Sequence, residues 1–171
     1  MHRLAFAVPV AACAGLLGFG LYLQYQQGQD PCPLCLVQRA FFVLILLAYA
    51  PAVLQNPGIA GTRVYGALGL LFALGGGGVA ARQVWLQHLP ADQVPACGPG
   101  LYFMLEHLPL ARTIEKLFKG SGECAEVTWR FLGLSIAEWA LAWFALLALY
   151  SLWLLLNGSP LPRRRGAPTP P

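Results

Sequence analysis

The sequence predicts an all-α membrane protein, a bundle of four transmembrane helices with a long periplasmic loop that carries a short interfacial helix. The first observation is composition: 57% of the 171 residues are hydrophobic, only 11% are charged, and the mean hydropathy is +0.59. A soluble domain carries about 25% charged residues, so these polar side chains are too few to cover a water-facing globule. Disorder is excluded because it requires low hydrophobicity, and a net charge of +4 is too small to indicate a nucleic-acid partner.

The second observation is the placement of four long uncharged segments, at residues 4–29, 40–62, 64–81 and 139–157. A helix needs about 20 residues to cross about 30 Å of hydrocarbon. Adding a turn at the polar ends predicts spans at about 4–25, 35–54, 64–86 and 136–156, within a single membrane domain over residues 1–158. Four soluble core helices of this length are the alternative, but they would leave almost no polar surface.

The first span has a competing interpretation. Residues 10–13 resemble a lipoprotein cleavage site that ends at Cys13. A cleaved signal has a short apolar region that ends at the cut, whereas the apolar run here continues ten residues beyond Cys13. We therefore expect a retained first helix, with Cys13 as a small hydrophobic residue in the membrane.

The third observation is the sorting of charges between the two sides. With four spans both termini share one side, and that side has five bases and no acid: Arg3, Arg63, Arg163, Arg164 and Arg165. All seven acids fall on the other side. The positive-inside rule predicts cytoplasmic termini, which makes residues of about 26–34 and 87–134 periplasmic loops. Residues 159–171, rich in proline and arginine, are predicted to form a disordered cytoplasmic tail.

Four of the five cysteines lie in or beside these outward loops, at Cys32, Cys35, Cys97 and Cys124. An outward, oxidising compartment permits disulfides. The spacing divides the four into a close pair, Cys32 with Cys35, and a distant pair, Cys97 with Cys124.

The close pair lies at the entry to the second helix. Proline is favoured at the first helical position, so Pro33 predicts Cys32 as the N-cap and Cys35 in the first turn. A helix N-terminus stabilises a thiolate. Arg39 follows Cys35 by four residues and therefore shares its helical face. This arginine can stabilise a thiolate, bind an anionic or carbonyl-bearing ligand, or simply reach the lipid headgroups.

Two other uses of the cysteines stay open at this point. Four thiolates can form a zinc site, although such sites usually show two close pairs or histidine partners. His88 and His107 show no paired ligand pattern, so no metal is expected. Purely structural disulfides in a membrane scaffold are the other alternative.

Further local patterns concern the long loop and the last two spans. Apolar residues at 114, 117 and 118 predict the short amphipathic helix on the membrane surface. Ser135 and Glu138 form a capping box at the start of the fourth helix. Four glycines, residues 75–78, permit either close helix contact or a local weakening of the third helix.

Taken in order, these motifs resemble the bacterial disulfide bond formation protein B family, DsbB. The resemblance is carried by Cys-Pro-Leu-Cys-Leu-Val-Gln-Arg at residues 32–39, Pro-Ala-Cys at 95–97, Gly-Ser-Gly-Glu-Cys-Ala-Glu at 120–126 and Trp-Arg-Phe-Leu-Gly at 129–133. It covers all four helices and both outward loops. A Cys-x-x-Cys motif alone is common, whereas the ordered set with this topology is specific.

The resemblance implies a protein dithiol:quinone oxidoreductase of the bacterial inner membrane. In that family a periplasmic, thioredoxin-fold oxidase of the DsbA type is reoxidised through the long-loop disulfide, and electrons pass through the Cys-x-x-Cys to a membrane quinone. By position, Cys97 forms the mixed disulfide with the partner and Cys124 then attacks Cys32. Cys35 lies beside the quinone, with Arg39 binding or polarising its ring.

A second quinone contact is less well defined. Some family members have a histidine linked to quinone binding near the outer end of the third helix. This sequence has Arg82 and Gln83 near that level, so Arg82 is the second candidate and His88 is not assigned this role. The expected quinone is ubiquinone or menaquinone, and the protein is expected to be a monomer that docks its partner transiently.

Overall fold

A computed structural model describes residues 2–28, 31–90, 92–94, 109, 112, 122–127 and 129–157 of the chain. Four long helices account for most of them: α1 (His2–Gln26), α2 (Pro33–Gln55), α3 (Ile59–Gln87) and α7 (Ile136–Asn157). Between α3 and α7 lie the single turn α6 (Gly122–Ala125) and a hairpin of β1 (Arg130–Phe131) with β2 (Leu134–Ser135). The predicted interfacial helix and cytoplasmic tail lie outside the described residues.

The prediction of a four-helix membrane bundle is confirmed. Segments Leu4–Gln26, Pro33–Gln55, Ile59–Gln87 and Ile136–Asn157 are each long and apolar enough to cross a membrane. The third helix begins at Ile59, five residues before the predicted start at 64. Gly58 is its N-cap, and the added residues 59–63 end at Arg63, the charge at which the uncharged segment was divided.

Local sequence signals determine where two of the helices begin. Cys32 is the N-cap of α2, and its sulfur accepts a hydrogen bond from the Cys35 backbone N–H at 3.3 Å. At the start of α7, Glu138 Oε2 accepts from the Ser135 N–H at 2.6 Å, and Ser135 Oγ accepts from the Glu138 N–H at 3.3 Å. Both predicted caps are confirmed, and each satisfies backbone donors that a helix start leaves unpaired.

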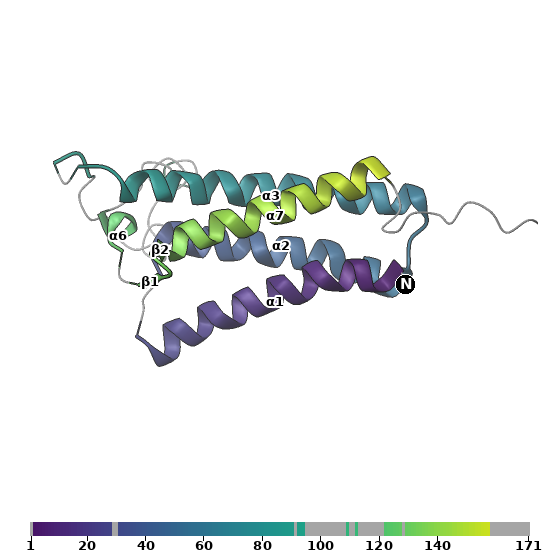
Figure 1. Ribbon diagram of the computed structural model, residues 1–171, viewed down its shortest axis with the longest axis horizontal. Helices are drawn as coiled ribbons and strands as arrows, with labels where there is room; N and C mark the ends of the chain where they lie inside the picture. The colour runs from purple at the N-terminus through teal and green to yellow at the C-terminus, as the bar shows by residue number, and fades with distance from the viewer. Residues whose placement is uncertain are drawn as a thin grey trace, which may run out of the picture.

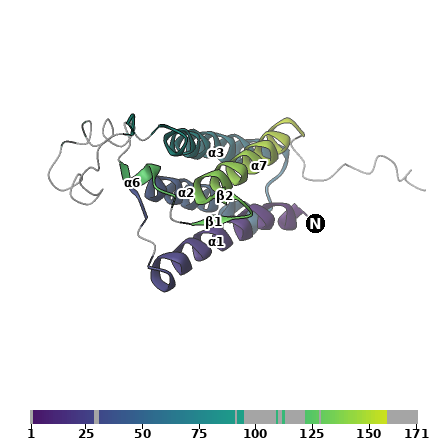
Figure 2. The same ribbon diagram turned by 60° about the vertical axis from the view of Figure 1, so that its left-hand side comes forward.

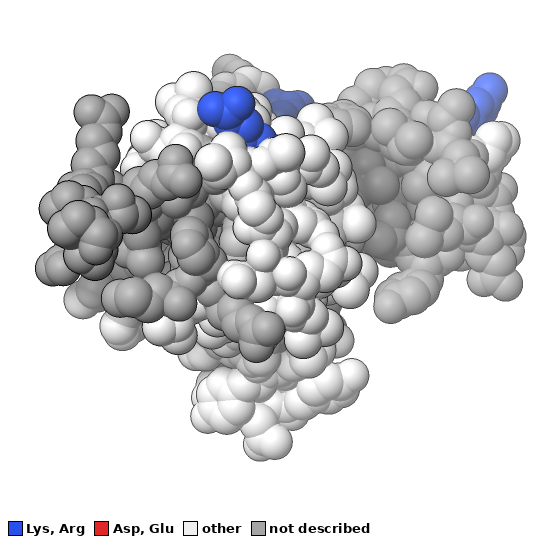
Figure 3. All heavy atoms as spheres, turned by 90° about the vertical axis from the view of Figure 1, so that its right-hand side faces the viewer, with Lys and Arg blue, Asp and Glu red and all other residues white. Residues whose placement is uncertain are grey.

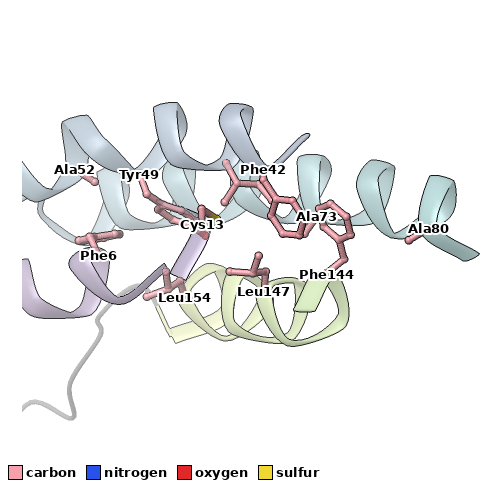
Figure 4. Close-up of a cluster of buried hydrophobic side chains, with 11 residues drawn as sticks. Phe6, Cys13, Phe42, Tyr49, Ala52, Ala73, Ala80, Phe144, Leu147 and Leu154 are labelled. Carbon is pink, nitrogen blue, oxygen red and sulfur yellow. The ribbon is translucent and has the colours of Figure 1, made fainter. Parts of the chain in front are cut away.

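Helix α3 is the centre of the bundle, because it packs against α7 on one side and α2 on another, whereas α1 packs mainly on α2 (Figure 1). The buried core between the helices is aromatic and aliphatic (Figure 4). Its central contact is the stack of Phe42 on Phe144, with ring centroids 4.1 Å apart. Large apolar side chains also cover the outside, including Leu47, Leu71 and Leu149, as expected where lipid replaces water.

Glycines in α3 bring the helices close together. A Cβ at Gly66 would lie 2.9 Å from the Leu155 backbone nitrogen of α7, and a Cβ at Gly75 would lie 2.6 Å from the Phe41 ring of α2. A Cβ at Gly76 would overlap the Phe144 ring. The helix is continuous through residues 75–78, and within this run Gly75 and Gly76 permit close helix contact, whereas a Cβ at Gly78 would meet nothing within 4 Å.

Helix α1 separates from the other helices toward its C-terminal end, as both ribbon views show (Figures 1 and 2). Near its start it is tied to α7, because Tyr150 donates to the Ala5 carbonyl at 2.7 Å. Near its end, the hairpin comes close to it: the Phe19 ring meets the Trp129 ring edge to face at 5.8 Å. The space between α1, α2 and α7 at this end holds the candidate site.

Candidate functional site

Three cysteines meet where α2 begins and α3 ends. Cys32 and Cys35 come from the first turn of α2, and neither is in a disulfide. Cys124 lies on α6, which packs against the ends of α3 and α2. Cys32 and Cys124 are buried in one cluster with Leu34, and Cys35 packs against that cluster. The Cys32 side chain is hydrogen-bonded with those of both Cys124 and Cys35, so it connects the loop cysteine to the helix cysteine.

This position affects the ionisation of Cys32, which lies just outside the membrane span. Hydrogen bonds with the Cys124 and Cys35 side chains favour its protonated form, and burial adds to the effect. All these causes raise the pKa of the Cys32 thiol above its ordinary value. In the dithiol state Cys32 is therefore held as a thiol between two other sulfurs.

Gln83 of α3 completes this group, although sequence reasoning gave it no role. Its Nε2 lies 3.4 Å from Cys32 Sγ and 3.3 Å from Cys35 Sγ, and its Oε1 accepts from Gln38 Nε2 at 2.6 Å. Both glutamines are buried, each with 4% of its surface exposed. A glutamine near the end of an apolar span was the available signal, because a buried polar group in a membrane is costly unless it is paired.

Beside the cysteines lies a cavity of about 600 Å³, lined by residues of α1, α2, the end of α3, α7 and the segment that contains the β-hairpin. Cys32, Cys35 and Gln83 line one side of it. Its remaining walls are largely apolar and include six aromatic residues: Phe19, Phe42, Trp129, Phe131, Trp139 and Trp143. Ligand pockets typically measure about 300–1,000 Å³ and combine apolar walls with a few polar groups, and this cavity has both properties.

Four of these aromatic residues form a chain of ring contacts from α1 to α7, beginning with Phe19 against Trp129. Trp129 stacks on Phe131 at 5.9 Å, and Phe131 meets Trp139 at 6.1 Å. The Trp139 indole N–H donates to the Phe131 carbonyl at 3.1 Å, which fixes the hairpin to α7. Flat rings at this wall favour a flat ligand, because aromatic surfaces stack.

Arg39 brings a positive charge to the same cavity. Its Nη1 donates to Gln24 Oε1 at 2.6 Å, and its Nη2 donates to the Gly20 carbonyl at 2.9 Å. A Cβ at Gly20 would lie 3.3 Å from the guanidinium, so glycine there permits the close approach. Helix α1 therefore holds Arg39 on the cavity wall, on the same face of α2 as Cys35.

The structure thus brings together Cys32, Cys35 and Arg39 from the start of α2 and Cys124 from α6, two separate parts of the chain. Cys97 lies outside the described residues. Arg82 does not appear among the residues that line the cavity; its guanidinium carbon lies 4.1 Å from the centroid of the Trp85 ring. Within the described part of the chain, no group of three His, Cys, Asp or Glu side chains is arranged to hold a metal ion.

Comparison with known proteins extends these observations over most of the chain. Residues 2–154 match the family model described as disulfide bond formation protein DsbB. The chain is 48% identical over 165 residues to disulfide bond formation protein B of Chromobacterium violaceum, covering 96% of each chain. It is 51% identical over 156 residues to the protein of that name from Azoarcus sp., covering 91% of this chain and 93% of the relative.

A third relative, disulfide bond formation protein B of Hahella chejuensis, is 52% identical over 143 residues, which cover 84% of this chain and 87% of the relative. Identity of about half over nearly the full length includes the helices that build the cavity and the loop that carries Cys124. Four apolar spans, a Cys-x-x-Cys at the start of the second and a loop cysteine in contact with it therefore have one explanation: this chain belongs to the disulfide bond formation protein DsbB family.

Proposed function

We propose that this protein reoxidises a DsbA-like thiol oxidase in the periplasm and passes the electrons through two cysteine pairs to a membrane quinone. In this proposal it is an inner-membrane protein with both termini in the cytoplasm. The charge distribution supports that orientation. In the view onto the end where α1 begins and α7 ends, the described residues show basic side chains, all of them Arg, and no Asp or Glu (Figure 3).

The observation that carries the proposal is the chain of sulfur contacts that ends at the cavity. Cys124 contacts Cys32, Cys32 contacts Cys35, and Cys32 and Cys35 both line the cavity with Arg39. Thiol–disulfide exchange requires one sulfur to approach another directly. This arrangement gives electrons a route from Cys124 of the long loop to a pocket between membrane helices.

The first exchange uses the loop pair in its oxidised form, Cys97 joined to Cys124. A thiolate of the partner attacks the Cys97 sulfur, so that a partner–Cys97 bond forms and Cys124 leaves as a thiolate. Cys124 then attacks Cys32 of the oxidised Cys32–Cys35 pair. A Cys124–Cys32 bond forms, the Cys32–Cys35 bond breaks, and Cys35 leaves as a thiolate.

Two further exchanges complete the transfer. The second thiol of the partner attacks its own sulfur in the mixed disulfide, which releases the oxidised partner and the Cys97 thiolate. Cys97 attacks Cys124, restores the loop disulfide and releases Cys32. The net result is one disulfide formed in the partner, while Cys32 and Cys35 hold the two electrons and two protons taken from it.

The cavity has the chemistry that a quinone requires. Arg39 is a donor suited to a carbonyl oxygen, and the tryptophan and phenylalanine walls suit a flat apolar ring. Cys35 faces the same space and is the sulfur nearest in sequence to Arg39 on that helix face. The chemistry that a quinone supplies when bound is acceptance of two electrons and two protons, which leaves the cysteine pair as a disulfide.

The test is quinone reduction by the purified full-length protein. It is mixed with a reduced thioredoxin-fold oxidase and with ubiquinone or menaquinone, and quinone absorbance is followed with partner thiols measured in parallel. We expect one quinone reduced for each partner disulfide formed. Cys35→Ser should reduce the rate to background, whereas Cys13→Ser, a buried cysteine of the helix core, should retain it.

Absence of quinone reduction by the wild-type protein, or full activity of Cys35→Ser, contradicts the proposal. A membrane scaffold with structural disulfides predicts that an oxidised Cys32–Cys35 pair does not exchange with the reduced partner in the absence of quinone. A membrane zinc protein predicts stoichiometric zinc that blocks thiol alkylation. Either result would replace the redox assignment.

A further inference from the structure

The Gln83 side chain occupies the space between the two sulfurs of the Cys-x-x-Cys. It comes from α3, whereas both cysteines come from the start of α2. One amide nitrogen lies within hydrogen-bond range of both Cys32 Sγ and Cys35 Sγ. Because an NH₂ group carries two hydrogens, it can donate one hydrogen to each sulfur.

Gln38 determines which end of the Gln83 amide faces the cysteines. Gln38 follows Cys35 by three residues and so lies on the same face of α2. Its Nε2 donates to Gln83 Oε1 at 2.6 Å. Gln83 Nε2 is then the amide atom nearer to both sulfurs, and Oε1 also accepts from the neutral Cys35 thiol at 3.7 Å. With Gln38 in its observed orientation, turning the Gln83 amide alone would set donor against donor, and two buried groups would lose a partner.

A donor pair at this place matters because exchange produces a negative charge on sulfur. Hydrogen bonds to an ionised acceptor are about twice as strong as neutral ones, and the low dielectric of a buried site increases the effect. The carbonyl end of Gln83 would instead repel that charge. The amide orientation is therefore matched to thiolates, not only to neutral thiols.

We propose that Gln83 is a catalytic residue that donates its two amide hydrogens to Cys32 and Cys35, and that Gln38 is the positioning residue that orients it. Part of this inference rests on the proposed function: the leaving sulfur when Cys124 attacks Cys32 is Cys35, and Gln83 stabilises it. The same hydrogen bond increases the thiolate population of Cys35 in the dithiol state. That second effect can be measured without partner or quinone.

The experiment is alkylation of the fully reduced, full-length protein with iodoacetamide, with Cys35 modification quantified by site-resolved mass spectrometry between pH 5 and pH 10. Gln83→Met keeps a similar side-chain length and removes the donors. We expect its Cys35 alkylation rate at pH 6.5 to fall about tenfold, the effect of one lost hydrogen bond to a charged group. The rates should converge at pH 10, where the thiol ionises in both proteins.

Two further variants separate the roles. Gln83→Glu keeps the shape and the acceptor for Gln38 but places an oxygen against the sulfurs, so Cys35 alkylation at pH 6.5 should fall at least as far. Gln38→Met leaves the Gln83 donors present but not oriented, and should give a smaller loss of about threefold. Gln55→Met, at the other end of α2 where Gln55 accepts from the Tyr65 hydroxyl, is the matched control and should follow the wild-type profile.

Superimposable pH profiles for wild type, Gln83→Met and Gln83→Glu would overturn the inference. So would a loss of equal size at every pH, because it would indicate altered access to Cys35 rather than altered ionisation. If the alkylation effect is found but the wild-type protein reduces no quinone, the amide–sulfur inference stands and the proposed function fails. The two outcomes are therefore distinguishable.

Discussion

The two ends of the helix bundle are packed in different ways. Around Tyr49, Gly66 and Ser151 the helices are in close contact, and the Tyr49 hydroxyl lies 2.8 Å from Ser151 Oγ with both side chains fully buried. We call this region the closed half. Around Cys32 and Arg39, α1 separates from the bundle and leaves the cavity of about 600 Å³. We call this region the open half.

The difference indicates that the two halves of the same helices have different roles. The open half contains costly features for a membrane interior, namely a cavity, a guanidinium and two buried glutamines. The closed half compensates through tight packing, because helix association in lipid depends on van der Waals contact between small residues. Substitutions in the closed half should therefore affect stability first, and those in the open half should affect chemistry first.

The largest expected effect is on packing in the closed half. Gly66→Ala adds a Cβ that would lie 2.9 Å and 3.0 Å from backbone atoms of α7, so a helix must move. Overpacking of this kind costs about 2 kcal/mol, measurable as a lower midpoint of thermal unfolding in detergent micelles.

Gly78→Ala is the matched control, because the same substitution on the same helix meets nothing within 4 Å. It should leave stability unchanged or raise it by up to about 1 kcal/mol, the difference in helix propensity between the two residues. Equal effects at the two positions would show that close packing of α3 on α7 is not what stabilises the closed half.

The next effect belongs to the open half and concerns Arg39. Arg39→Ala should raise the apparent KM for quinone about tenfold, equivalent to about 1.4 kcal/mol, while thiol exchange between the partner and Cys97 continues. Quinone titrations with a fixed concentration of reduced partner measure the first quantity, and trapping of the mixed disulfide measures the second. Arg63→Ala, at the opposite end of the bundle, is the control.

Unchanged quinone kinetics in Arg39→Ala would show that Arg39 does not bind the quinone. Arg82→Ala tests the second quinone contact proposed from the sequence. The position of Arg82 over Trp85 favours an unchanged KM, whereas an increase similar to that of Arg39→Ala would restore it as a ligand contact.

The contrast between Arg82 and Gln83 shows how far the sequence could predict this site. Hydropathy located the four spans, and Pro33 and the Ser135–Glu138 pair located two helix starts. Neighbouring residues on a helix point about 100° apart, so the level of a residue along α3 does not determine which side it faces. Apolar residues are spread around all sides of α3 and do not form one stripe, so no amphipathic pattern shows which face meets α2.

Contacts between distant segments were also beyond prediction from spacing. The approach of Cys124 to Cys32 depends on how α6 packs against the ends of α2 and α3. The spacing of the cysteines did not predict this contact, whereas the resemblance to the DsbB family implied it. The β-hairpin was missed because Leu132 and Gly133 form its turn with φ of 53° and 82°. Asn-Gly or Asp-Gly is the usual signal for such a turn, and leucine rarely adopts this conformation.

The smallest expected effect concerns two buried serines, one in each half of the bundle. Ser135 in the open half caps α7 and donates to Gln87 Oε1 at 2.7 Å. Ser151 in the closed half donates to the Leu147 carbonyl at 2.6 Å and pairs with Tyr49. Replacing either serine with alanine should lower the free energy of unfolding by about 1 kcal/mol, through a lost cap in one case and a lost buried hydrogen bond in the other.

The two serine variants should lose similar amounts of stability, but enzyme kinetics should distinguish them. Ser135 and Gln87 both line the cavity. Ser135→Ala removes the hydrogen bond that holds Gln87 and the cap that fixes the start of α7. The apparent KM for quinone should therefore rise about twofold, equivalent to about 0.4 kcal/mol. Ser151→Ala should leave that KM unchanged, because no residue it contacts reaches the cavity among those described. If the two variants change KM equally, the halves are mechanically coupled, and the closed half contributes to ligand binding as well as to stability.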